Sequence, residues 1–130
     1  MLSHLFNVTH AYLRENGLKS VARDERWPSI RKQYLEKSPE CEACKFTKAL
    51  QVHHIVPFHE DPSKELEITN LITLCMGPNE CHLIIGHGGS FKKYNPNVVK
   101  DAYHVLNHPN DMDSIKTAAI KSALPNDPNR

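Results

Sequence analysis

Four cysteines constrain this chain of 130 residues more than any other feature of its sequence. Cys41 and Cys44 are separated by two residues, a spacing that lets two thiolates from one tight turn bind a single tetrahedral zinc ion. Cys75 and Cys81 supply a second pair, provided that the five residues between them loop outward. We therefore expect a small domain closed by a structural zinc ion. The alternative is that Cys75 and Cys81 are buried apolar residues beside a lone pair.

The first 15 residues favour metal binding by these cysteines over disulfide pairing. They lack an uninterrupted apolar stretch and contain the polar residues His4, Asn7, Thr9, His10 and Arg14, so we expect neither a signal peptide nor a membrane anchor. We expect a cytoplasmic protein with no membrane partner, in a compartment that keeps thiols reduced. Disulfide pairing is the alternative.

Composition and charge are those of one globular domain. The chain is 39% hydrophobic and 24% charged, and its formal charge of +1 is too small to identify a nucleic-acid-binding protein by itself. Basic residues are frequent in residues 14–48 and acidic residues in 59–67. The N-terminal half could form a basic face, although a mixed solvated surface fits equally well. We expect residues 59–67 to form a polar loop.

The pattern of apolar residues predicts helices and two short strands. We expect a helix at 27–38, strands at 50–55 and 71–75, a short helix at 80–87, and helices at 98–107 and 112–124. The predicted organisation is an N-terminal arm (1–18), a central domain (19–107), and a C-terminal helix with a disordered tail (108–130).

Two neighbouring histidines, His53 and His54, stand at the end of the first predicted strand. Adjacent residues on a strand point to opposite faces, so one ring could bind a metal ion while the other faces a substrate. Two unrelated core or surface histidines would give the same pattern.

The complete set of motifs resembles the HNH endonuclease family, and most closely its stand-alone phage and bacterial members. That family has a CxxC, a strand ending in Asp/His-His-Ile-x-Pro, an Asn-Leu-x-x-Leu-Cys strand and a Cys-His helix with a further His or Lys. The matching residues are Cys41, Cys44, His53, His54, Ile55, Pro57, Asn70, Leu71, Leu74, Cys75, Cys81, His82 and His87. The second cysteine pair is three residues wider than the first, and His82 and His87 are five apart where four is commoner.

The resemblance implies an α+β fold with a ββα-metal core, and it implies roles for individual residues. His53 and His82 would hold the catalytic cation, with His87 as a third ligand. His54 would be the general base, and Asn70 would steady the loop that bears His54. The four cysteines would hold the structural zinc.

The function implied by the resemblance is endonucleolytic hydrolysis of DNA, leaving 5′-phosphate and 3′-hydroxyl ends. Expected cofactors are a structural Zn²⁺ and a catalytic divalent cation, which could be Mg²⁺, Mn²⁺, Ni²⁺, Co²⁺ or Zn²⁺. The expected partner is duplex DNA bound with little sequence preference, in a bacterium or phage-infected host and in a packaging or restriction context. The alternatives are a non-catalytic zinc ribbon that binds nucleic acid or protein, and a nuclease that cuts RNA.

Overall fold

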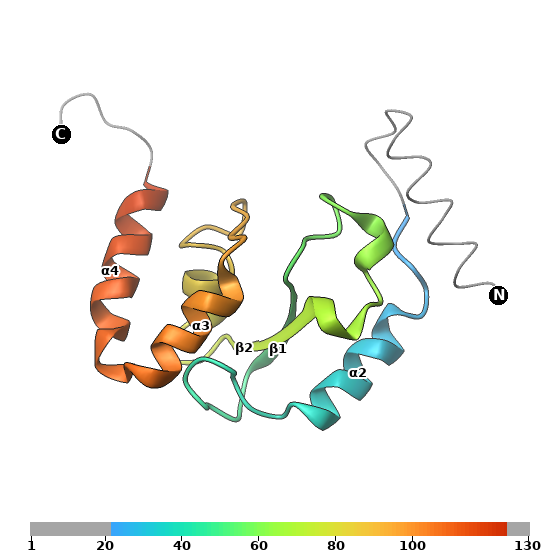
Figure 1. The fold of residues 1–130 in the computed structure, drawn as a ribbon, viewed down its shortest axis with the longest axis horizontal. Helices are drawn as coiled ribbons and strands as arrows, with labels where there is room; N and C mark the ends of the chain where they lie inside the picture. Colours follow the sequence, from blue (N-terminus) through green and yellow to red (C-terminus); the bar gives the residue numbers. More distant parts are fainter. Residues whose placement is uncertain (1–21, 125–130) are drawn as a thin grey trace.

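The computed structural model describes residues 22–124, so the predicted arm (1–18) and the tail after residue 124 lie outside the described part. Its helices and strands are α2 (Trp27–Lys37), β1 (Leu50–His54), β2 (Leu71–Cys75), α3 (Val98–Asn107) and α4 (Met112–Ala123). Shorter turns are η1 (Pro62–Lys64), η2 (Ile68–Asn70), η3 (His82–Gly86) and η4 (Pro109–Asp111). The predicted α+β class is confirmed, with the helices and strands close to their expected bounds (Figure 1).

Helix α2 begins at Trp27-Pro28 because proline has its fixed φ and lacks an N–H, both of which suit the first helical turn. It ends at Lys37, because the next residue, Ser38, precedes Pro39 and the helical conformation is disfavoured there. The phenol of Tyr34 donates a hydrogen bond of 3.0 Å to the carbonyl oxygen of Leu71. This bond ties α2 to the start of β2.

Strands β1 and β2 form a two-stranded antiparallel sheet in which Leu50 pairs with Cys75 and His54 pairs with Leu71. All five residues of β2 are buried. Glu42 lies alongside β2: its backbone N–H donates to the Thr73 carbonyl (2.9 Å), and its carboxylate accepts from the Thr73 N–H (2.6 Å). This pairing brings the Cys41–Cys44 turn next to the end of β2, where Cys75 lies.

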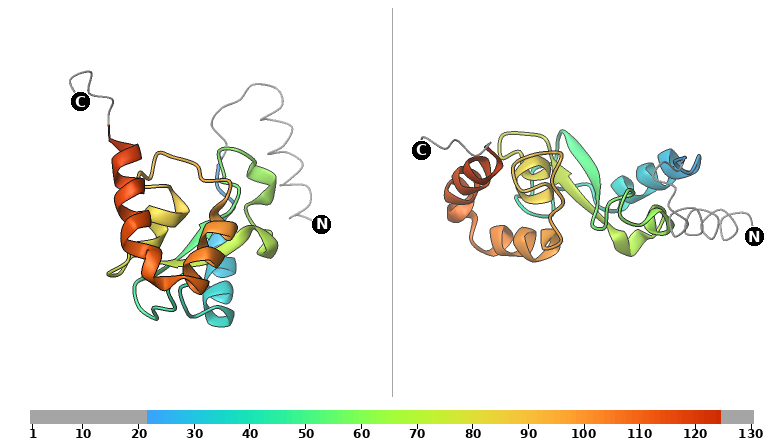
Figure 2. Two further views of the ribbon diagram at one scale, coloured as in Figure 1. Left: turned by 60° about the vertical axis from the view of Figure 1, so that its left-hand side comes forward. Right: turned by 90° about the horizontal axis from the view of Figure 1, so that it is seen from above.

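The two faces of the hairpin are covered differently. Helix α2 and the loop with η1 and η2 lie on one side, while η3, α3 and α4 lie on the other (Figures 1 and 2). The buried core is on the second side, where α3 contributes Val98, Ala102 and Val105 at helical spacing. The cysteines and residues of β2 and η3 complete this core.

The short helix predicted at 80–87 is present as a π-helical turn over His82–Gly86. A π turn closes i→i+5 hydrogen bonds and therefore holds about one residue more than an α-helical turn. Within residues 22–124, no helix has the length and apolar character needed to cross a membrane.

Candidate functional site

The four cysteines lie together, although they come from two distant stretches of the sequence. One sulfur atom from each of Cys41, Cys44, Cys75 and Cys81 lies within 4.8 Å of the other three, and the Cys44 and Cys75 sulfurs are 3.6 Å apart. A tetrahedral zinc with Zn–S bonds of about 2.3 Å would place its sulfurs about 3.8 Å apart. All four are free thiols. The donor set and its dimensions therefore fit one zinc ion.

The widened second pair, Cys75 and Cys81, is accommodated by the loop between them. Residues 76–80 turn outward from the end of β2, and Glu80 has a φ of 48° immediately before Cys81. Gly77 lies against the ring of Phe46, where an added Cβ would come within 2.4 Å of a ring carbon. The loop is thus folded back onto the segment that follows the first cysteine pair.

The thiols differ in how easily they lose a proton. A hydrogen bond from Cys81 lowers the pKa of Cys41 to about 5. The same hydrogen bond, followed by burial, raises the pKa of Cys81, and burial raises the pKa of Cys75. One thiolate is therefore stabilised by its neighbours, and a cation would be needed to hold all four sulfurs deprotonated.

Three histidines form the second cluster. One ring nitrogen each of His53, His82 and His87 lies within 4.8 Å of the other two. The Nε2 of His53 and the Nδ1 of His82 are buried and have no hydrogen-bond partner among residues 22–124. Unpartnered buried polar atoms are rare in proteins, and here two of them belong to one cluster. Both observations fit a cation held by these rings.

Electrostatics and hydrogen bonding prepare the three imidazoles to act as ligands. Burial lowers the pKa of His53 to about 3 and that of His82 to about 4, so both rings are neutral near pH 7 and have a free lone pair. The Nδ1–H of His87 donates to the carbonyl oxygen of Lys93 at 2.9 Å, which leaves Nε2 as its acceptor. The π turn places His82 and His87 on one side of η3 despite their spacing of five.

His54 points away from this cluster, as alternation along a strand requires. Its Nε2 lies 2.8 Å from the backbone carbonyl of Glu65, and a carbonyl only accepts, so Nε2 carries the proton and Nδ1 has the lone pair. Burial lowers the pKa of His54. The Trp27 ring lies against the imidazole, with centroids 4.3 Å apart. His54 is therefore a neutral base in a fixed tautomer.

Asn70 fastens the loop that follows His54. Its Oδ1 accepts from the Val56 N–H at 2.8 Å, and its Nδ2 donates to the carbonyls of Val56 (3.0 Å) and Lys64 (3.1 Å). The side chain is buried, so these three bonds are shielded from water. They connect the end of β1 to the turn η1 and to the start of β2.

The three-histidine cluster and His54 line the same cleft, which has a volume of about 250 Å³. His53, His82 and His87 contribute to it together with His54, and half-exposed Phe91 lies with its ring centroid 5.1 Å from that of His87. The other residues of its lining are Arg23, Val52, Pro57, Phe58, His59 and Lys93. A group that binds the three-histidine cluster would therefore lie beside His54.

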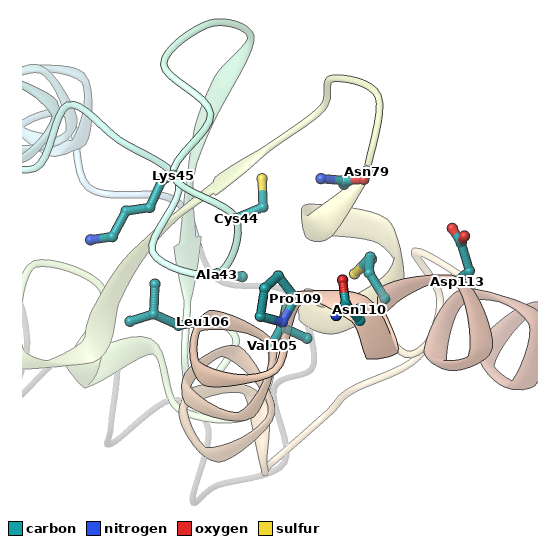
Figure 3. A pocket seen from close by; sticks show the side chains of 10 residues that line it. Ala43, Cys44, Lys45, Asn79, Val105, Leu106, Pro109, Asn110 and Asp113 are labelled. Carbon is teal, nitrogen blue, oxygen red and sulfur yellow. The ribbon is translucent and has the colours of Figure 1, made fainter.

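A second hollow, of about 470 Å³, lies between the first cysteine pair and the corner where α3 meets α4 (Figure 3). Its lining includes Cys44 but none of the three clustered histidines and not His54. Leu106, Pro109 and Met112 give it an apolar wall. The groups able to hold a cation and move a proton thus meet in the histidine cleft.

One residue beside the cleft was not anticipated from the sequence. Glu65 belongs to the acidic segment 59–67, which was expected to be a polar loop, and its side chain is 1% exposed. It is buried because η1 folds the loop back onto the segment before α2, where Arg23 pairs with its carboxylate. Trp27 is partly buried and contacts His54. Residue spacing indicates neither the burial of Glu65 nor this contact.

Residues 41–88 match the family model described as HNH endonuclease. This segment is an HNH endonuclease domain. The resemblance drawn from the sequence is confirmed, and the match begins at Cys41 and includes both ligand clusters, His54 and Asn70. No curated protein and no solved structure matches the chain. The family that this segment matches is of the nuclease type and uses a divalent metal ion.

Proposed function

We propose that this HNH protein is a metal-dependent endonuclease that hydrolyses phosphodiester bonds of DNA, leaving 5′-phosphate and 3′-hydroxyl ends. One observation carries the proposal. A neutral histidine of fixed tautomer, His54, lines the same cleft as three convergent imidazoles, two of which have buried nitrogens without a partner among the described residues. A base and a cation site at one cleft are what water-driven phosphodiester hydrolysis requires.

In the proposed mechanism, His54 removes a proton from the attacking water. The Glu65 carbonyl holds the Nε2–H, and this leaves Nδ1 to accept the proton. The ring cannot easily rotate because Trp27 packs against it and Asn70 fastens the loop beyond it. When protonated, the imidazolium shares its charge with the carbonyl oxygen of Glu65, which stabilises the product of the proton transfer.

The three imidazoles of His53, His82 and His87 are the residues that would hold the catalytic cation. Bound there, a divalent cation supplies Lewis-acid stabilisation of the charge that develops on the phosphate and on the leaving oxygen. The four cysteines would hold a structural zinc, because four thiolates close the coordination sphere and leave no position for water. We thus assign cleavage to the histidine cluster and structural support to the cysteine cluster.

The test is cleavage of supercoiled plasmid DNA and of a structured RNA by the purified chain, with Mg²⁺, Mn²⁺, Ni²⁺, Co²⁺ and Zn²⁺ in parallel. We expect DNA cleavage with at least one cation, and nicked product that DNA ligase reseals without prior phosphorylation. The His54→Ala variant should be inactive while keeping its metal content and melting temperature. His108→Ala is the matched control, because His108 is exposed and does not line the cleft.

Three results would contradict the proposal. Retained cleavage in His54→Ala would remove the assigned base. Cleavage of RNA with intact DNA would change the substrate class. Absence of cleavage with every cation, combined with stoichiometric zinc and tight nucleic-acid binding, would favour a non-catalytic zinc module.

A further inference from the structure

A buried carboxylate lies next to the histidine cleft, and its partners determine what faces the cleft. The Glu65 side chain is 1% exposed. One oxygen, Oε2, pairs with the Nε of Arg23, and the other, Oε1, accepts from the backbone N–H of Asp24 at 2.7 Å. A buried carboxylate is unfavourable unless it is paired and hydrogen-bonded, so this geometry is strongly constrained. The constraint fixes the guanidinium of Arg23.

Arg23 belongs to the cleft that contains the histidines. It lines the cleft, its side chain is 50% exposed, and its guanidinium carbon is 4.5 Å from the ring centroid of Phe58, another lining residue. The carboxylate of Glu65 occupies Nε. The two terminal amino groups form no hydrogen bond within residues 22–124. Arg23 thus presents a guanidinium that is fixed at one edge and has donors available at the other.

Glu65 also orients the proposed base. Its backbone carbonyl accepts from Nε2 of His54 while its side chain holds Arg23, so the base and the guanidinium are positioned by one residue. The segment that carries Arg23 runs beside the loop with η1 and leads into α2 (Figure 1). Any group activated by His54 would therefore lie close to Arg23.

The cleft contains few side chains that could bind a negatively charged phosphate. Arg23 and Lys93 are the two lining residues with permanently positive side chains, and the other polar side chains of the lining are imidazoles. The amino group of Lys93 is tethered to Ser122, with 3.3 Å to its carbonyl oxygen. A guanidinium whose two amino groups have no partner within residues 22–124 can match two oxygens of a phosphate in a planar fork. Arg23 is thus the side chain suited to bind the reacting phosphate.

We propose that Arg23 binds the non-bridging oxygens of the scissile phosphodiester and stabilises the negative charge that develops there, and that Glu65 positions it. This inference rests on the proposed nuclease function. It assigns to a residue outside the matched segment 41–88 a direct part in the reaction.

The experiment compares Arg23→Gln and Arg23→Lys with Arg26→Gln. Arg26 is the matched control because it also pairs with a carboxylate, that of Asp24, but does not line the cleft. Two substrates are used at saturating Mn²⁺: plasmid DNA and bis(p-nitrophenyl) phosphate, which carries one phosphodiester and no other phosphate. We expect Arg23→Gln to lower kcat about 100-fold on both substrates. Arg26→Gln should stay within about twofold of the wild type.

Arg23→Lys guards against loss of folding, because lysine keeps a positive charge beside the buried carboxylate. We expect it to retain the wild-type melting temperature and metal content. Its kcat should lie between the values for the wild type and for Arg23→Gln. Arg23 variants as active as Arg26→Gln would overturn the inference. So would a loss confined to DNA and abolished at low salt, since that pattern marks a remote backbone contact. Inactive wild-type protein on both substrates would instead overturn the proposed function itself.

The positioning role of Glu65 has its own measurement. Glu65→Gln keeps an oxygen to accept from Asp24 but removes the charge that orients the guanidinium. If Glu65 acts through Arg23, Glu65→Gln should lower kcat in the wild-type background and have little further effect in Arg23→Lys. Additive losses would show that Glu65 acts independently of Arg23 and would overturn that part of the inference.

Discussion

Replacement of Asn70 by alanine should destabilise the domain through the loop 55–70. The substitution removes three hydrogen bonds, of 2.8, 3.0 and 3.1 Å, to the backbone of Val56 and Lys64. At about 1 kcal/mol for each bond, the free energy of unfolding should fall by about 3 kcal/mol. For a domain of this size the melting temperature should fall by more than about 10 °C.

The assay is urea denaturation at a fixed free zinc concentration, with Asn107→Ala as the control. Asn107 makes one exposed bond, to the Tyr103 carbonyl at 2.8 Å, so its removal should cost less than about 0.5 kcal/mol. Well below the melting temperature, Asn70→Ala should still cleave about 100-fold more slowly, because His54 is no longer held in place. A cost as small as that of Asn107→Ala would refute the reasoning.

The Asn70→Asp variant adds a dependence on pH. Its carboxylate would place an oxygen where Nδ2 now donates to two carbonyls, so the pKa of the new carboxyl should be raised in the folded state. A raised carboxyl pKa means that the folded state binds more protons than the unfolded state, and stability then decreases as pH rises. The destabilisation relative to the wild type should therefore be smaller at pH 5 than at pH 7. Equal destabilisation at both would contradict the assigned orientation of the amide.

Further predictions concern the two metal clusters, the contact of α4 and the binding of DNA. Cys44→Ser should strip about one tightly bound zinc per chain and lower the melting temperature sharply, whereas His82→Ala should abolish cleavage with little change in melting. Metal analysis and calorimetry check both, and a Cys44→Ser protein that retains its zinc would contradict the cysteine assignment. Gly89→Ala should destabilise by about 1 to 3 kcal/mol, because the new Cβ would lie 2.4 Å from the Ala119 carbonyl oxygen at a φ of +100°. Gly88→Ala, with open space around it, should cost less. Duplex DNA binding should be weak and should fade with salt because the net charge is only +1, and tight salt-resistant binding to one sequence would refute this.

Much of the framework was predictable because its signals are local. The Trp27-Pro28 start and Ser38-Pro39 end of α2 follow from backbone rules for proline, and both strands appear where apolar and β-branched residues concentrate. The separation of His53 from His54 onto opposite faces follows from the pleat of a strand. These features depend on neighbouring residues alone.

The parts that the sequence could not predict depend on contacts between distant segments. Nothing in the spacing of Glu65 separates it from the other acidic residues of its loop, because its burial depends on Arg23 and Asp24, about 40 residues earlier. Trp27 is similar, since its contact with His54 requires α2 to pack against β1. The width of the helical turn at 82–86 was unpredictable for another reason: residue spacing by itself does not distinguish an α-helical turn from a wider one.

The π-helical turn between His82 and His87 bears on how such a site can change through insertion and deletion. Its two ends are held separately, by Cys81 within the cysteine cluster and by the hydrogen bond from the His87 ring to Lys93. In a regular helix one added residue would rotate everything after it by about 100°. The wider turn absorbs that residue locally and leaves the third imidazole facing the other two. One residue could therefore be inserted into or deleted from this turn during evolution while the three rings stay together.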